Sequence, residues 1–132
     1  MPAAESDRRD YPRLKKTIPV RYKFISSHVK DPAMDRVCDG TTQNVSMGGL
    51  LLMGPVPRLD WVKDLLLGRI TIGVNLIVPS QVHPVKVLAR IAWIEAMDEG
   101  AINMRMGLRI IEVPTEHRKV LSDFLAIETS VS

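Results

Sequence analysis

The sequence is poor in cysteine and in aromatic residues, and it contains no long hydrophobic run. Cys38 is the only cysteine among 132 residues, which excludes an intramolecular disulfide and a paired-cysteine metal site. No apolar run approaches the roughly 20 residues of a membrane span, and the N-terminus lacks the apolar core of a signal peptide. Aromatic residues make up only 5%, so the core must be largely aliphatic. We therefore expect a cytoplasmic protein in a reducing compartment.

Recognisable catalytic and metal-binding patterns are also missing. The sequence has no GxSxG motif, no Walker-type phosphate loop, no dinucleotide fingerprint and no evident pair of carboxylates for acid–base chemistry. His28, His83 and His117 fall in separate segments, without cysteine or carboxylate at metal-ligand spacing. We therefore expect a protein that is not an enzyme and that binds no metal.

What the chain does contain is an ordinary balance of 45% hydrophobic and 25% charged residues, which predicts one folded domain. The formal net charge of +3 is unevenly placed. Residues 1–23 hold seven Lys or Arg against three Asp or Glu, whereas the remainder is nearly neutral. This distribution favours a local anion site near the N-terminus over the broad basic face of proteins that bind duplex nucleic acid.

Hydrophobic and polar residues alternate along much of the chain, which is the period of half-buried strands. The pattern predicts six strands, and we place them at residues 18–24, 36–46, 50–53, 70–78, 85–93 and 102–110. Gly54 and Pro55 are expected to end the third strand, and residues 98–100 to turn the chain between the last two. Short connections imply an antiparallel sheet, and closing it into a barrel removes exposed edges. The predicted fold is therefore all-β, a six-stranded antiparallel β-barrel.

Two segments have helical spacing instead. Residues 59–66 predict a short helix, with Asp60 as its N-cap and Gly68 at its end. A C-terminal α-helix begins at Pro114 and Thr115, and we expect its apolar stripe to pack on the barrel. This stripe consists of Val120, Leu121, Phe124 and Leu125.

Three arginines, Arg8, Arg9 and Arg13, lie within six residues ahead of the first predicted strand. Pro12 disfavours a helix in this segment, so we predict a flexible, extended N-terminal arm. Guanidiniums on such an arm can close on a ligand from different directions, and each can bind phosphate oxygens in pairs or the O6 and N7 edge of guanine. The alternative is a solvated basic tail that makes weak contacts with nucleic acid or a membrane.

A second motif, Asn44-Val45-Ser46-Met47-Gly48-Gly49, lies between the second and third predicted strands. Its spacing predicts a small polar platform on which Asn44 offers a donor and an acceptor and Ser46 a hydroxyl. Gly49 has no side chain to keep a flat purine away from the backbone. The alternative is a turn in which Asn44 and Ser46 cap backbone groups and the glycines supply positive φ angles.

Together, Arg9-x-x-x-Arg13 followed by a strand and then Asn44-x-Ser46-x-x-Gly49 resembles the PilZ domain family, whose members are receptors for the bacterial second messenger cyclic di-GMP. The resemblance extends through Ala92-Trp93 and residues 105–110 to the C-terminal helix. It implies a six-stranded barrel with a C-terminal helix over residues 17–129, preceded by a ligand-binding arm at residues 1–16. The cyclic di-GMP site that it implies consists of Arg8, Arg9, Arg13, Asn44, Ser46, Gly48, Gly49 and Trp93.

Individual roles follow from the same resemblance. Arg9 and Arg13 would grip phosphates and guanine edges, with Arg8 able to join them, while the 44–49 motif would hold a guanine against the barrel. Asn44 stands where the family uses Asp or Asn, so a neutral amide replaces the usual carboxylate contact to guanine. Trp93 matches a position that can approach the ligand, but it shares parity with core residues of its strand, so packing in the core or at the barrel rim is an equal alternative.

The resemblance implies a cyclic di-GMP sensor that passes ligand occupancy to an unidentified downstream protein. A degenerate PilZ-like adaptor that contacts only proteins is a second possibility, against which the intact arginine and Asn/Ser/Gly motifs count. A small barrel that binds single-stranded nucleic acid is a third, but it would need stacking aromatic residues, and the chain has two Trp, two Tyr and two Phe.

Overall fold

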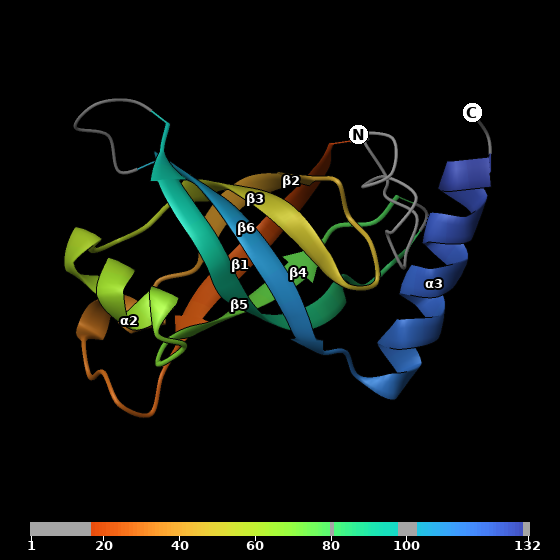
Figure 1. Ribbon diagram of the computed structural model, residues 1–132. Helices are drawn as coiled ribbons and strands as arrows, with labels where there is room; N and C mark the ends of the chain where they lie inside the picture. Colours follow the sequence, from red (N-terminus) through yellow and green to blue (C-terminus); the bar gives the residue numbers. More distant parts are fainter. Residues whose placement is uncertain (1–16, 80, 98–102, 131–132) are drawn as a thin grey trace.

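The computed structural model describes residues 17–79, 81–97 and 103–130, with side chains described up to residue 126 (Figure 1). Six strands close into an antiparallel barrel in the order β1-β2-β3-β6-β5-β4, which confirms the predicted fold class. The strands are β1 (Ile18–Ile25), β2 (Cys38–Gln43), β3 (Gly49–Pro55), β4 (Thr71–Leu76), β5 (Val85–Ala96) and β6 (Asn103–Glu112). The helical elements are η1 (Pro32–Asp35), η2 (Leu59–Trp61), α2 (Val62–Leu66) and α3 (Thr115–Ser130).

The barrel interior is filled by the alternate residues that the sequence pattern predicts. Buried positions alternate with exposed ones along the whole of β1, with partly buried ones along β4, and with exposed or partly buried ones in the first half of β5. Three aromatic rings run through this aliphatic core toward the short helices. Phe24 contacts Tyr22 with ring centroids 5.8 Å apart and Trp61 with centroids 5.4 Å apart.

Tyr22 is the largest polar side chain inside the barrel, and two glycines make room for it. A side chain on Gly40 or Gly54 would overlap the Tyr22 ring or its hydroxyl. The hydroxyl donates a hydrogen bond to the carbonyl oxygen of Pro55 at 2.5 Å. The buried phenol is therefore paired, as a polar group in a low-dielectric interior must be.

Several predicted strand ends are wrong, for local reasons. β2 stops at Gln43 because Asn44 adopts a left-handed φ of 54°. β3 is not ended by Gly54 and Pro55, which pair with Met104 and Asn103 of β6. The predicted turn at 98–100 lies outside the described residues.

The short helical segment is confirmed, but its predicted cap is wrong. Asp60 lies inside η2, and its carboxylate accepts a hydrogen bond from Arg58 Nη2 at 3.1 Å rather than from the helix backbone. This bond lowers the pKa of Asp60 below its ordinary value. Gly68 ends α2 with a left-handed φ of 77°, as expected of a C-terminal glycine. Trp61 and Leu65 are the residues of this segment that enter the core.

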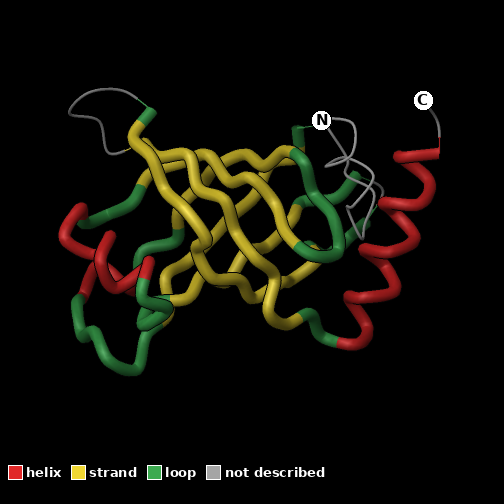
Figure 2. Tube along the Cα trace, in the orientation of Figure 1, coloured by secondary structure: helices red, strands yellow, loops and turns green. Residues whose placement is uncertain are grey.

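The C-terminal helix α3 packs on the barrel as predicted. Leu121, Phe124 and Leu125 are buried and Val120 is partly buried, whereas the charged residues of the opposite face are exposed. His117 Nδ1 accepts a hydrogen bond of 2.7 Å from the backbone N–H of Lys86, which ties the first turn of α3 to the start of β5. α2 and α3 lie at opposite sides of the barrel (Figures 1 and 2). Among the described residues no helix has both the length and the apolar character needed to cross a membrane.

Candidate functional site

The predicted ligand motif forms the turn between β2 and β3, on the side of the barrel where α3 lies (Figure 2). Ser46 holds this turn together. Its hydroxyl oxygen accepts hydrogen bonds from the backbone N–H groups of Gly48 and Gly49, each at 3.2 Å, and its own N–H donates to the Gly49 carbonyl at 2.9 Å. The residue is only 6% exposed. The hydroxyl thus fixes the shape of the turn, which is the capping arrangement considered for this motif.

Asn44 is placed quite differently from Ser46. Its backbone is left-handed, a conformation that asparagine tolerates better than most residues. The glycines of the motif do not have positive φ, so the expectation that they would supply it is wrong. The Asn44 side chain is half-buried and makes no hydrogen bond with any described residue, which leaves its amide donor and acceptor available to a ligand.

Gly48 and Gly49 attach the turn to the neighbouring strand β6. The Gly48 carbonyl accepts a hydrogen bond of 3.0 Å from the Ile110 N–H, and Gly49 pairs with Arg109. A Cβ atom on Gly49 would lie 2.5 Å from the Leu108 carbonyl oxygen, well inside van der Waals contact. Glycine at this position is therefore required by the close approach of two strands, whatever it also does for a ligand.

The arm that carries the predicted arginines joins the barrel beside this turn. Arg8, Arg9 and Arg13 lie outside the described residues, which begin at Thr17. Gln43 Nε2 donates a hydrogen bond to Thr17 Oγ1 at 3.0 Å, and Gln43 is the residue immediately before Asn44. Arg13 precedes Thr17 by four positions in the sequence, and four steps of extended chain span at most about 14 Å. Chain length alone therefore limits how far Arg13 can lie from Thr17, the residue bonded to Gln43.

Trp93 lies on the outside of the barrel, so its interpretation as a core residue is wrong. A register shift between Ile91 and Trp93 inserts one extra residue in β5, and Trp93 then pairs with Gly107 on the outer face of β6. Trp93 is 45% exposed. A Cβ atom on Gly107 would overlap the indole nitrogen, so the ring lies directly over this glycine.

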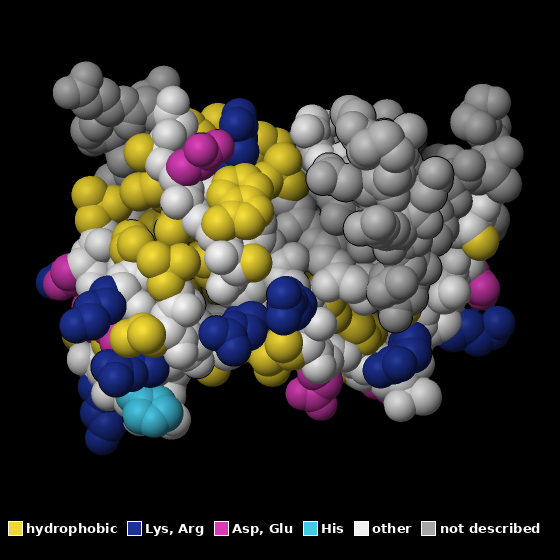
Figure 3. Space-filling view, in the orientation of Figure 1, with side chains coloured by type: hydrophobic (Ala, Val, Ile, Leu, Met, Phe, Trp, Pro, Cys, Tyr) yellow, Lys and Arg dark blue, Asp and Glu magenta, His cyan; other side chains and the backbone are white. Residues whose placement is uncertain are grey.

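Trp93 belongs to the wall formed by the paired strands β3, β6 and β5. On the face of the molecule in Figure 3, hydrophobic side chains gather with Lys and Arg around them. Pairing across the three strands defines the rows of this wall. Leu51, Gly107 and Trp93 form one row, and Gly49, Arg109 and Arg90 form the next. Sequence reasoning gave Gly107 no role of its own, although the Trp93 ring lies over it. A glycine between alternating residues of a strand was the available signal, since it marks a close approach from outside.

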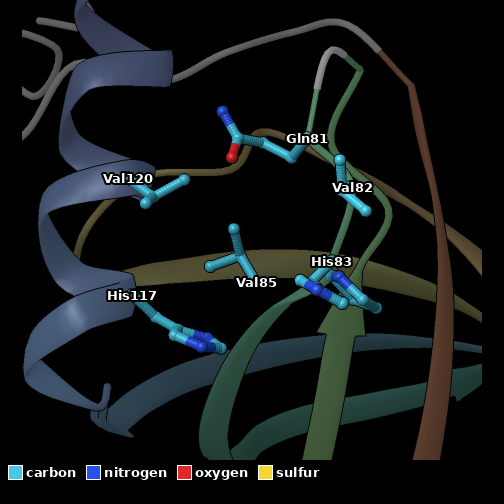
Figure 4. A pocket seen from close by; sticks show the side chains of 7 residues that line it. Gln81, Val82, His83, Val85, His117 and Val120 are labelled. Atoms are coloured by element: carbon cyan, nitrogen blue, oxygen red, sulfur yellow. The ribbon is translucent and has the colours of Figure 1, made fainter.

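A separate pocket of about 300 Å³ lies between the loop before β5 and the first turns of α3 (Figure 4). It brings together His83 and His117, which are 34 positions apart in the sequence. His117 Nδ1 already accepts from the backbone of Lys86. Within the described residues, no three or more His, Cys, Asp or Glu side chains are grouped so that they could hold a metal ion.

Comparisons with known proteins agree with this architecture. The structure resembles an inhibitor of motility (MotI/DgrA) from Bacillus subtilis with a TM-score of 0.62 and 16% identity over 91% of this chain. The chain spans only 50% of MotI/DgrA. It also resembles the PilZ domain of YcgR from Escherichia coli, solved with c-di-GMP, with a TM-score of 0.55, 12% identity and coverage of 93% of this chain and 92% of that domain.

At these identities the two structures establish a shared fold. The search of curated proteins found no match. The sequence itself matches the PilZ domain over residues 7–126, which is most of its length and includes both predicted motifs. The chain belongs to the PilZ domain family.

Proposed function

We propose that this protein is a cyclic di-GMP receptor domain, with an arm at residues 1–16 and a barrel at residues 17–129 that close together on the ligand. The observation that carries the proposal is the junction at Thr17, bonded to Gln43 one residue before Asn44. This bond links the first described residue after the three arginines to the turn in which the Asn44 amide has no hydrogen-bond partner among the described residues. Family membership and the cyclic di-GMP bound to the YcgR domain support the choice of ligand.

The proposed roles follow from the chemistry of each group. Arg9 and Arg13, with Arg8 beside them, bind phosphate oxygens and guanine O6 and N7 through charge-assisted hydrogen bonds. The Asn44 amide oxygen accepts from the guanine N1 and N2 hydrogens. Ser46 keeps the turn in shape, and Gly48 and Gly49 let a base approach the backbone. Trp93 offers an exposed indole on the adjoining wall.

The same chemistry defines what the receptor does. Binding brings cationic arm residues onto the barrel, so a protein partner would meet a different surface in the ligand-bound state. No bond is made or broken in this scheme, and the protein acts as a sensor without catalysis or a metal. A receptor for an intracellular second messenger would act in the cytoplasm.

Calorimetric titration with cyclic di-GMP and, at the same salt concentration, cyclic di-AMP tests the proposal. Adenine replaces the O6 acceptor by an amino donor, which the arginine forks cannot accept, and it lacks the N2 group that Asn44 receives. Each unpaired polar group costs about 1–3 kcal/mol, so we expect a preference for cyclic di-GMP of about a hundredfold or more. Equal affinities for the two dinucleotides would show that the site binds anions without recognising guanine. If neither dinucleotide bound, the result would favour the adaptor alternative.

A further inference from the structure

We propose that Arg109 of β6 is a further ligand-binding residue, which contacts a phosphate of the cyclic dinucleotide from the strand next to the β2–β3 turn. This inference rests on the proposed function, and it adds a third element to a site otherwise built from the arm and the β2–β3 turn. Arg109 is exposed and pairs directly with Gly49, the last residue of the turn motif. Directly paired residues of antiparallel strands have Cα atoms about 4.5–5.5 Å apart.

A hydrogen bond between β6 and the turn holds Arg109 close to the motif. The Ile110 N–H donates to the Gly48 carbonyl at 3.0 Å, so the residue next to Arg109 is hydrogen-bonded to the motif itself. Arg109 lies on the outer face of β6, together with Arg105 and Gly107. A ligand that rests on Gly48 and Gly49 would therefore lie within reach of the Arg109 guanidinium.

Three arginines of β5 and β6 are exposed, and they differ in the groups that their side chains contact. Arg105 Nη1 donates to Glu95 Oε1 at 3.1 Å, so its charge is already paired. Arg90 packs over Gly68, where a Cβ atom would lie 2.8 Å from its Nη2. Arg109 makes no side-chain hydrogen bond or ion pair with the described residues. Of these three, Arg109 is both unpaired and adjacent to the turn.

Arg109 also stands opposite another cation. Its partner in the β5–β6 pairing is Arg90, and like charges directly opposite each other on a sheet destabilise it. An anion beside Arg109 would offset this repulsion. The two facing arginines thus make the sheet less stable by themselves, but they favour the binding of an anionic ligand.

The experiment compares Arg109→Gln with Arg105→Gln, a variant with the same change of charge on the same face of the same strand. We expect Arg109→Gln to weaken cyclic di-GMP binding more than about tenfold and to reduce its salt dependence. Arg105→Gln should change affinity less than about threefold, since it breaks only an exposed ion pair. Arg109→Lys, which keeps the charge but loses the fork, should fall between wild type and Arg109→Gln.

The outcomes separate this inference from the proposed function. If the wild type binds cyclic di-GMP and Arg109→Gln binds equally well, the role of Arg109 is refuted while the receptor function stands. If Arg109→Gln and Arg105→Gln lose affinity equally, only the overall charge of the wall matters and the inference is again overturned. If the wild type does not bind, both proposals fail. Equal thermal unfolding temperatures for wild type and Arg109→Gln would show that the loss is one of binding.

Discussion

At the scale of single residues, Ser46 and Asn44 of the same motif differ in their hydrogen bonds. The Ser46 hydroxyl is used up by three contacts inside the turn, whereas the Asn44 amide has none among the described residues. The motif therefore combines a residue that holds the turn together with a residue whose side chain has no hydrogen-bond partner in the described part of the chain. Unpaired, half-buried amides are costly unless solvent or a ligand completes them, which is why we assign recognition to Asn44.

The arginines of the arm are the sharpest test at this scale. We expect Arg9→Ala or Arg13→Ala to weaken cyclic di-GMP binding more than about tenfold, because each removes charge-assisted hydrogen bonds of about 1.5–3 kcal/mol. The unfolding temperature should be unchanged in both variants. Calorimetry with parallel thermal melts measures both quantities. Unaltered affinity in either variant, or a loss of stability that matches the loss of binding, would remove these residues from the site.

Tyr22 leads to a prediction about pH and stability. Burial raises the pKa of this phenol above its ordinary value of 10.0. The unfolded chain therefore loses the phenolic proton above pH 10 while the native barrel keeps it, so the free energy of unfolding falls as the pH rises. The slope reaches about 1.4 kcal/mol per pH unit for one such group. Urea unfolding at pH 8, 10 and 11 measures this decline.

Tyr22→Phe is the control for this effect. It removes the hydrogen bond to Pro55, at a cost of about 1 kcal/mol near neutral pH. Its stability should fall less steeply above pH 10, because the titrating phenol is gone. Burial also raises the pKa of the Cys38 thiol, and this contribution is common to both proteins. Parallel stability curves for wild type and Tyr22→Phe would contradict the assignment.

At the scale of strands and turns, the sequence predicts what is periodic and misses what interrupts the period. The alternation in residues 18–24 correctly predicted which side chains fill the barrel. The interpretation of Trp93 as a core residue was wrong because one extra residue in β5 reverses the faces beyond Ile91, and such a bulge is stabilised by the partner strand rather than by local propensity. Asn44 was predicted to be a ligand group, but its left-handed backbone was not predicted, because that conformation depends on the turn as a whole.

The same bulge gives a prediction about Trp93. Gly107→Ala should displace the indole, because an added Cβ would overlap its nitrogen. The fold should survive, since the φ of Gly107 is not positive and alanine is acceptable in that backbone. Trp61 is buried and Trp93 is 45% exposed, so a change in emission and in quenching by iodide would report on Trp93.

Gly73→Ala is the matched control for this substitution. Gly73 lies on a strand too, but a Cβ there would meet the flexible end of Ile25 at 3.1 Å and, at an ordinary contact distance of 4.0 Å, the Lys23 carbonyl oxygen. We expect its emission and iodide quenching to equal those of the wild type. If Gly107→Ala behaved in the same way, the proposed seating of the indole on Gly107 would be incorrect.

At the scale of the whole molecule, a closed barrel has no free edge on which a signal could add or remove a strand. We therefore expect a ligand to act on the exposed surface of the barrel and on the segments outside its wall. We expect amide exchange at residues 5–16 to slow when cyclic di-GMP is added, because the arm becomes ordered on the barrel. Exchange in the interior of β1 and β4 should hardly change. Strong protection of residues 5–16 in the ligand-free protein would contradict this mode of signalling.

The junction of arm and barrel at Thr17 also determines how the two halves of the proposed site meet. Because they belong to one chain and are joined by a few residues, their effective concentration is on the order of millimolar, and the arm needs only weak affinity of its own for the ligand-loaded barrel. Cleavage of the chain just before Thr17 would turn this closure into a bimolecular encounter at far lower cellular concentrations. A single proteolytic cut would then silence the receptor without altering any contact within the barrel.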